Sequence, residues 1–305
     1  MGMGVRFRLS AAAGITLLLS IGAVGRHATA GESLERITRT GRIVLGARDG
    51  SLPFSYVAGH GKPVGYTMDI CTKLVEAIRK HVNRPELQVT YLQVTPSTRF
   101  TSIVEGKSDL DCGPNTNTFE RRQRVAFTIP NFIATSRMLV HANAGIRNWS
   151  DLRGKLVVTT AGTTNARSIM ERNSTRALKI RLTEASDDHQ SFRQVEERKA
   201  DAFAMDDVLL FALRAASGRP ETYAIVGDPL TVEPYAIMFS KQDAELKKVV
   251  DGEMARIILS GEINTLYAKW FNSPIPPDGI NLNMPIGSLL RSSFQFPSDK
   301  VGDDW

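Results

Sequence analysis

An alternation of strand-like and helix-like segments from residue 41 onward most constrains what this chain can fold into. In residues 68–82 the apolar side chains recur at every fourth position, which is the spacing of an amphipathic helix. This alternation predicts a parallel sheet with helices on its faces. The segments in order are a strand (41–48), a helix (68–82), a strand (87–94), a short helix (96–107) and a strand (108–112).

The alternation restarts once. Residues 150–173 contain a polar lead-in, a strand, a Gly/Thr turn and a helix, and further segments follow with a similar rhythm. These further segments are a strand (178–185), a helix (187–199), a strand (200–207) and a helix (208–218). The chain is therefore predicted to be an α/β protein with two separate units.

Two strand-like runs, residues 131–142 and 230–241, separate the second unit from the rest, and residues 244–271 are helical in pattern. The C-terminal helices are too few for a third domain, but they would complete the first unit if the chain crosses back. We therefore expect two lobes with parallel-rich sheets joined by two crossing strands, a type II arrangement. Lobe 1 would comprise residues 31–134 with 235–305, and lobe 2 residues 135–234. The cleft between such lobes is the expected site.

The N-terminus is predicted to be a secretory signal peptide. Arg6 and Arg8 precede a short apolar run, and small residues then lead to a cleavage site after Ala30. The mature protein would thus be exported, and its tail beyond about Asn283 is predicted to wrap lobe 1 or to fray.

Composition argues against several kinds of partner. Removing the leader takes three arginines with it and lowers the formal charge from +6 to +3, and the remaining basic residues form no stripe interleaved with aromatic residues. Nucleic acid is therefore not an expected partner. The two cysteines and scattered histidines do not predict a metal site, and no cofactor is expected. Export permits a disulfide between Cys71 and Cys112, and two buried free thiols are the alternative.

Polar residues follow the predicted strands where the cleft should lie. Arg48 ends the first strand, a hydroxyl- and amide-rich run follows Cys112, a Gly/Thr turn follows Thr160, and Asp206 ends a strand of the second unit. Arginine binds carboxylates with paired charge-assisted bonds, and a carboxylate can receive an ammonium. The set therefore suits a small zwitterion, whereas the Gly-rich pattern of a phosphate loop is missing.

Several motifs resemble the periplasmic amino-acid-binding components of ABC importers, bacterial extracellular solute-binding proteins of family 3, and especially their glutamate/aspartate-binding branch. The resemblance runs from about Leu34 to Asn283. The motifs are "PFSY", "GYTMDI", "STRF", "DLDCG", "NTFERR", "VVTTAGTT", "DAFAMDD", "EPYAIMF" and "KWFNSPIPP". The resemblance implies an amino acid and a membrane permease as partners, a periplasmic location and no enzymatic activity. We also expect a monomer.

The resemblance implies five ligand-binding positions in lobe 1. Arg121 would hold the α-carboxylate of the amino acid. Thr116 would bond the α-carboxylate or the amine, and the carbonyl of Pro114 the amine. Arg48 and Arg99 would reach a side-chain carboxylate.

Lobe 2 would supply the remaining positions. Thr160 and Thr163 would close on the ligand, and Asp206 would receive its ammonium; capping of the following helices is the alternative for these three residues. Asp188 stands where the glutamate/aspartate branch has histidine, and His189 follows it. A carboxylate there would repel an acidic side chain unless His189 takes its place, so a neutral amide or a broader polar amino acid is an alternative ligand. Pro96 and Pro114 stand where the branch has serine.

Two other classes of function are alternatives. An exported dehydratase or lyase of this architecture would need a general acid or base in the cleft, with His189 and Glu184 as candidates. A receptor's sensor module would need a membrane span after the lobes, and the polar C-terminal tail does not have the composition of one.

Overall fold

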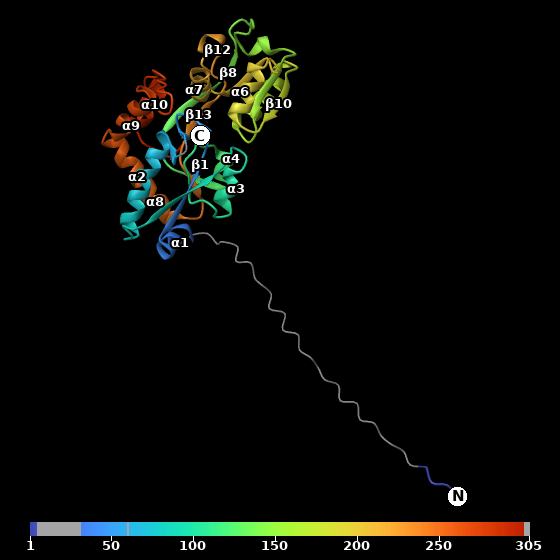
Figure 1. The fold of residues 1–305 in the computed structure, drawn as a ribbon, viewed down its shortest axis with the longest axis vertical. Coiled ribbons are helices and arrows are strands. Elements are labelled where there is room, and N and C mark those ends of the chain that lie inside the picture. Colours follow the sequence, from blue (N-terminus) through green and yellow to red (C-terminus); the bar gives the residue numbers. More distant parts are fainter. Residues whose placement is uncertain (5–31, 60, 302–305) are drawn as a thin grey trace.

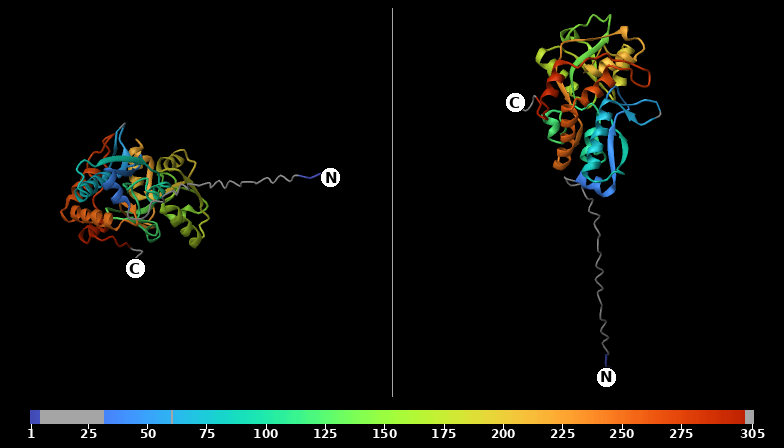
Figure 2. Two further views of the ribbon diagram at one scale, coloured as in Figure 1. Left: turned by 90° about the horizontal axis from the view of Figure 1, so that it is seen from below. Right: turned by 90° about the vertical axis from the view of Figure 1, so that its left-hand side faces the viewer.

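The computed structural model describes residues 1–4, 32–59 and 61–301. Residues 5–30 of the predicted leader lie outside this part of the chain. Two sheets, each flanked by helices, form two lobes (Figure 1). The blue-to-cyan segment of the first lobe and the green-to-yellow segment of the second lie on different sides of the molecule in both views of Figure 2. This is the two-lobed α/β architecture predicted from the alternation of segments.

The first lobe is built on a five-stranded sheet in the order β5-β1-β6-β14-β7. Strand β1 is parallel to both β5 and β6, whereas β14 is antiparallel to β6 and β7. The strands are β1 (Arg42–Ala47), β5 (Gln88–Gln93), β6 (Leu110–Asp111), β7 (Val125–Phe127) and β14 (Met238–Ser240). The helices of this part are α1 (Glu32–Thr40), α2 (Tyr66–His81), α3 (Arg99–Val104), α4 (Phe119–Arg122), α8 (Ala244–Leu259), α9 (Glu262–Phe271) and α10 (Ser288–Gln295).

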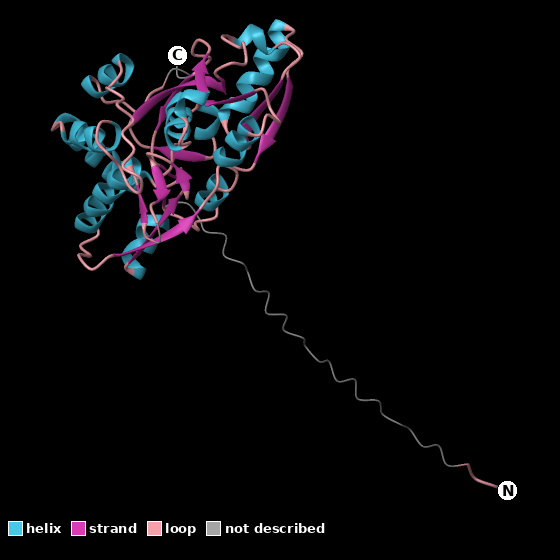
Figure 3. Ribbon diagram, turned by 45° about the horizontal axis from the view of Figure 1, so that its top comes forward, coloured by secondary structure: helices cyan, strands magenta, loops and turns pink. Residues whose placement is uncertain are grey.

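The second lobe repeats this plan. Its sheet has the order β10-β9-β11-β8-β12, with β9 parallel to β10 and β11, and with β8 antiparallel to β11 and β12. The strands are β8 (Phe132–His141), β9 (Leu156–Thr160), β10 (Arg181–Ala185), β11 (Ala202–Asp206) and β12 (Tyr223–Val226). The helices are η1 (Trp149–Leu152), α5 (Thr164–Arg176), α6 (Asp188–Glu196), α7 (Asp207–Ala216) and η2 (Pro220–Thr222). Figure 3 shows helices on either side of the strands.

Strand β8 and strand β13 (Val232–Tyr235) are the two crossings between the lobes. They pair with each other antiparallel, from Phe132 opposite Tyr235 to Thr135 opposite Val232. Strand β8 continues into the sheet of the second lobe, antiparallel to β11, and the chain after β13 enters the sheet of the first lobe as β14, antiparallel to β6. The run predicted as a single strand over 230–241 is two strands, since β13 ends at Tyr235 and β14 begins at Met238.

Helix α2 buries the apolar face that its sequence predicts. Its buried side chains include Ile70, Leu74 and Ile78, which share one face and pack in the core. That packing, and not intrinsic helix propensity alone, stabilises such a helix. Helix α2 also carries Cys71, which forms a disulfide with Cys112 across a Cα–Cα distance of 6.2 Å, so the predicted pairing is confirmed.

The parallel register brings the ends of the strands to one edge of each sheet. In the first lobe, Ala47 pairs with Gln93, and Gly46 with Asp111. In the second lobe, Thr160 pairs with Ala185. The residues that follow these strands therefore lie together at the carboxyl ends, where open α/β sheets bind ligands.

Two smaller features complete the fold. A sheet of three short strands, β2 (Gly50–Ser51), β3 (Ser55–Val57) and β4 (Pro63–Val64), lies between β1 and α2 in the chain. In the C-terminal tail, α10 contacts α8 and the crossing strand β8, with Leu290 buried. The described tail therefore packs on the protein, in keeping with the first of its two predicted paths.

Candidate functional site

Arg48 lies at the carboxyl end of β1 and is held in place by acceptors of the first lobe. Its Nη2 donates to Asn115 Oδ1 at 3.1 Å and lies 3.6 Å from Asp111 Oδ1. Its Nη1 faces the carbonyls of Val94 and Thr95 at 3.4 and 3.3 Å. The side chain is buried, yet its Nε–H has no acceptor among the described residues. The guanidinium therefore has a set orientation and a buried donor for a ligand.

Arg99 and Arg121 form a second cationic group beside it. Both guanidiniums lie 5.1 Å from the centre of the Phe100 ring, within the range of cation–π attraction. Arg121 Nη1 also donates to the carbonyl of Thr116 at 3.0 Å. Burial, followed by repulsion from Arg121 and Arg48, lowers the pKa of Arg99 well below its usual value. The three arginines thus lie close enough to repel one another, and an anion between them would be strongly favoured.

Thr160 and Asp188 form a polar wall of the second lobe. Thr160 is fully buried, and its hydroxyl donates to Asp188 Oδ1 at 2.6 Å and lies 3.0 Å from Ser191 Oγ. Burial raises the pKa of Asp188, and Thr160, His189 and Arg48 oppose that shift. The influence of Arg48 shows that this carboxyl group lies within electrostatic reach of the first lobe. Asp188 is buried, and the N-cap position of α6 is held by Asp187 instead.

Asp206 is a buried carboxyl at the carboxyl end of β11. It occupies the N-cap position of α7 but makes no capping bond; it accepts from Asn165 Nδ2 at 2.9 Å and from the Tyr235 hydroxyl. Burial and the nearby Glu233 raise the pKa of Asp206 to about 7. Glu233 is 2% exposed and accepts from the Thr164 hydroxyl at 2.8 Å. Burial also lowers the pKa of Arg121, while Glu233 and Asp206 act to raise it, so both carboxyl groups lie within electrostatic reach of Arg121.

The other predicted positions lie around this centre. Thr116 forms a backbone bridge with Tyr235, and Pro114 is buried in the loop after Cys112. Thr163 is the N-cap residue of α5, but its hydroxyl donates to the carbonyl of Thr160 at 2.7 Å instead of capping. His189 is exposed and its ring lies against Gly50, because an added Cβ there would meet Nε2 at 2.6 Å. Ligand contact by these residues stays a prediction.

Several residues that contact these side chains were not predicted from the sequence. Glu233 and Tyr235 come from crossing strand β13, and Asn165 from the first turn of α5. Asn115 and Asp111 hold Arg48. The one available signal was a glutamate inside an otherwise apolar crossing segment, because a buried carboxylate needs partners. Glu184, a candidate for the enzymatic alternative, is exposed on β10.

Two features are absent from the described residues. No cluster of three or more metal-ligating side chains occurs among them. None of their helices is long and apolar enough to cross a membrane.

Comparison with known proteins connects this geometry to a family. Residues 43–273 match the bacterial extracellular solute-binding proteins of family 3. The chain is 41% identical over 290 residues to an L-glutamate/L-aspartate-binding protein of Pseudomonas aeruginosa, covering 95% of each chain. It is 36% identical over 300 residues to a glutamate/aspartate import solute-binding protein of Escherichia coli, covering 97% of this chain and 99% of the other.

A solved structure supports the fold. The solute receptor for L-cysteine of Neisseria gonorrhoeae superposes with a TM-score of 0.67 at 23% identity, over 78% of this chain and 92% of the other. Fold, cleft and sequence agree: the chain belongs to family 3 of the bacterial extracellular solute-binding proteins.

Proposed function

We propose that this protein is the binding component of an ABC amino-acid importer and that it holds L-glutamate or L-aspartate between its lobes. One observation carries the proposal: Arg99 and Arg121 share the Phe100 ring, Arg48 and Arg121 lie close enough to Arg99 to lower its pKa, and Asp206 and Glu233 act on the pKa of Arg121. The naming of two relatives as glutamate/aspartate-binding proteins supports the same ligand class.

The charges of the cleft match those of an acidic amino acid. Such a ligand has two carboxylates and one ammonium group. Arg121 binds the α-carboxylate, and Arg48 and Arg99 the side-chain carboxylate, through charge-assisted hydrogen bonds. Asp206 receives the ammonium. Asp188 keeps the Thr160 hydroxyl as its partner, and the nearby His189 and Arg48 favour its charged form.

The smaller contacts come from both lobes. Thr116 and the carbonyl of Pro114 bind the α-amino and α-carboxylate groups from lobe 1, and Thr160 and Thr163 bind from lobe 2. His189 lies at the rim near Gly50. The lobes comprise residues 31–134 with 235–305, and 135–234, with the boundaries in β8 and after Pro234. A ligand that bonds to both lobes stabilises their closed arrangement, which the permease then recognises.

The protein works in the periplasm as a monomer without a cofactor or catalysis of its own. Its leader is cleaved after Ala30. The relatives named as import solute-binding proteins support a membrane transporter as the partner.

A thermal-shift panel tests the ligand class. The refolded mature protein is heated with each of the common amino acids at 1 mM, since refolding removes ligand carried from the host. Glutamate and aspartate should raise the melting temperature by several degrees, because a ligand at 1,000 times its Kd adds about 4 kcal/mol of stability. A shift with glutamine or arginine, and none with either acid, would contradict the proposal.

A further inference from the structure

The turn that follows β9 brings backbone of the second lobe into direct contact with backbone of the first. The Ser97 hydroxyl of the first lobe donates to the carbonyl of Ala161 at 3.4 Å. A Cβ added to Gly162 would lie 2.7 Å from the carbonyl oxygen of Pro96 and 3.1 Å from Ser97 Cα. Backbone of one lobe therefore rests on backbone of the other, and neither side can give way as a flexible side chain could.

The same glycine also contacts two of the arginines. Its carbonyl oxygen accepts from Arg99 Nη2 at 3.2 Å and from Arg121 Nη2 at 3.4 Å. Both guanidiniums belong to the first lobe, and the acceptor belongs to the second. A single oxygen from the closing lobe thus draws together two cations that repel each other, above the Phe100 ring that both share.

From these contacts we infer that Gly162 is a positioning residue that couples closure of the lobes to the alignment of Arg99 and Arg121. The inference rests on the proposed function. When the lobes are apart, the two guanidiniums lack this acceptor. When the turn docks on Pro96 and Ser97, the carbonyl orients both donors, so the carboxylate clamp is complete only in the closed protein. Gly162 acts through its backbone carbonyl alone.

The chain offers a matched control for a substitution at this glycine. Gly162 has φ +78°, a conformation that L-residues rarely adopt, so alanine there is strained whatever the space. Gly154 of the same lobe has φ +72°, but a Cβ added to it meets no atom within 4 Å. Gly162→Ala and Gly154→Ala therefore share the backbone strain and differ in the clash between the lobes.

The test combines small-angle X-ray scattering with calorimetric titration of L-glutamate and L-aspartate. Wild-type protein and Gly154→Ala should contract at ligand saturation and bind with the same Kd within about twofold. Gly162→Ala should stay expanded at saturation and bind at least tenfold more weakly. The melting temperatures of the two ligand-free variants should fall by similar amounts, because both variants carry the same backbone strain.

The outcomes separate the inference from the function on which it rests. Contraction and affinity of Gly162→Ala equal to those of Gly154→Ala would overturn the coupling. A wild-type protein that binds neither acid would instead overturn the proposed function. If Gly162→Ala does not fold, Ser97→Trp adds bulk to the opposite side of the same contact at an exposed position, and it should likewise prevent contraction; normal contraction of that variant would overturn the inference.

Discussion

Asp206 and Asp207 are adjacent, but their carboxylates have different partners. Asp206 faces the cleft with Tyr235 and Asn165. Asp207 accepts from the backbone N–H groups of Thr135 at 3.1 Å and Val208 at 2.8 Å, which ties α7 to the crossing strand β8. Variants at the two positions can therefore separate the proposed ligand binding from folding.

Asp206→Asn should weaken glutamate binding by about 30-fold or more, since loss of a buried charge partner is worth about 2–5 kcal/mol. The unfolding free energy should fall little, because a buried carboxylate with a raised pKa favours the neutral form that asparagine imitates. Asp207→Asn should instead lower stability by about 1 kcal/mol and leave the Kd unchanged. Calorimetry and urea unfolding check both; equal losses of affinity in the two variants would contradict the assignment.

The raised pKa of Asp206 predicts a pH dependence with a defined sign. Burial and Glu233 raise it to about 7, so below that pH the ligand-free protein holds a proton that the ammonium of the ligand must displace. Affinity should therefore fall as the pH decreases from 8.5 to 5.5, by up to about tenfold per unit below the pKa. In the ligand-free protein the sign is opposite: the contribution of this group to stability is fully present below about pH 4 and is lost as the pH rises through 7.

Titrations at pH 5.5, 7.0 and 8.5 in buffers of different ionisation enthalpy would detect proton release on binding. Asp206→Asn is the control, and its Kd should depend less on pH. An affinity that rises toward pH 5.5 in the wild-type protein would contradict this account.

Among single residues, the sequence predicted those at the carboxyl ends of strands, such as Arg48 after β1 and Asp206 at the end of β11. Their positions follow from the rule that parallel strands end at one edge of a sheet. Glu233 and Tyr235 were not predicted, because their strand belongs to neither α/β unit and its direction through the cleft depends on tertiary packing. The hydrogen-bond partner of Asp188 could not be predicted from the sequence either, because Thr160 lies 28 positions away along the chain.

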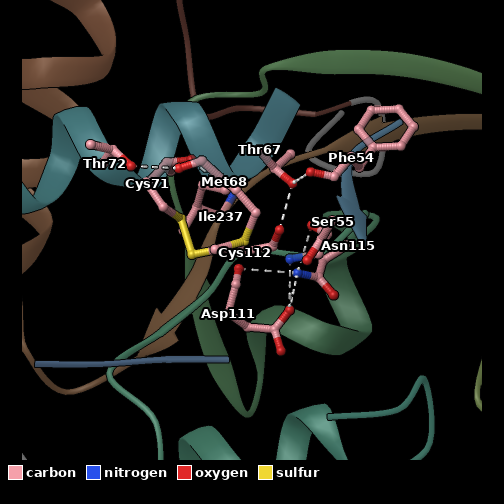
Figure 4. Close-up of a disulfide and its surroundings, with 12 residues drawn as sticks. Phe54, Ser55, Thr67, Met68, Cys71, Thr72, Asp111, Cys112, Asn115 and Ile237 are labelled. Carbon is pink, nitrogen blue, oxygen red and sulfur yellow. Dashed lines mark hydrogen bonds between the residues drawn. A yellow bond between two sulfur atoms is a disulfide. The ribbon is translucent and has the colours of Figure 1, made fainter. Parts of the chain in front are cut away.

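At the scale of elements, the disulfide joins helix α2 to the end of strand β6. Figure 4 shows Cys71 on the helix and Cys112 beside Asp111 and Asn115, the residues that hold Arg48. The Thr67 hydroxyl of the same helix also donates to the carbonyl of Cys112. The disulfide therefore fixes the segment that holds Arg48 to helix α2.

Replacing both cysteines by alanine should lower the unfolding free energy by about 4 kcal/mol, because the bond closes a loop of 41 residues in the unfolded chain. Urea unfolding of the double variant, compared with the wild-type protein with and without reductant, measures this change. Reduction should destabilise the wild-type protein and leave the double variant unaffected. Equal stability of reduced and oxidised wild-type protein would contradict the prediction.

Sequence periodicity predicted long elements better than short ones. Helix α2 lies close to the predicted 68–82, since its apolar face is regular over four turns. The helical run 244–271 is two helices because Gly261 adopts φ +78° between them. The two- and three-residue strands β2, β3 and β4 have too few positions to show a period.

At the scale of the whole molecule, an ion pair and a hydrogen bond from an arginine link the lobes. Arg167 of α5 forms an ion pair with Glu120 of α4, but both side chains are more than half exposed. Arg121 also reaches across to Gly162, and it is the proposed carboxylate clamp. Arg121 is partly buried, whereas Arg167 is exposed.

Arg121→Gln should therefore weaken glutamate binding by about 100-fold, whereas Arg167→Gln should change the Kd by less than about fivefold, since exposed ion pairs contribute about 0–1 kcal/mol. Calorimetric titration of the two variants under one buffer condition compares them directly. A larger loss for Arg167→Gln would mean that surface charge, and not the clamp, controls closure.

We expect the arginine cluster to select an acidic amino acid, and calorimetric titration of the refolded mature protein with L-glutamate, L-aspartate, L-glutamine and L-asparagine measures that selectivity. Each acid and its amide have nearly the same shape and differ by one charge. One of the acids should bind with micromolar or tighter affinity, about −8 kcal/mol or more favourable, and the amides at least tenfold more weakly. Amides that bind as tightly as the acids, or more tightly, would contradict it and would make Asp188 the residue that sets the specificity.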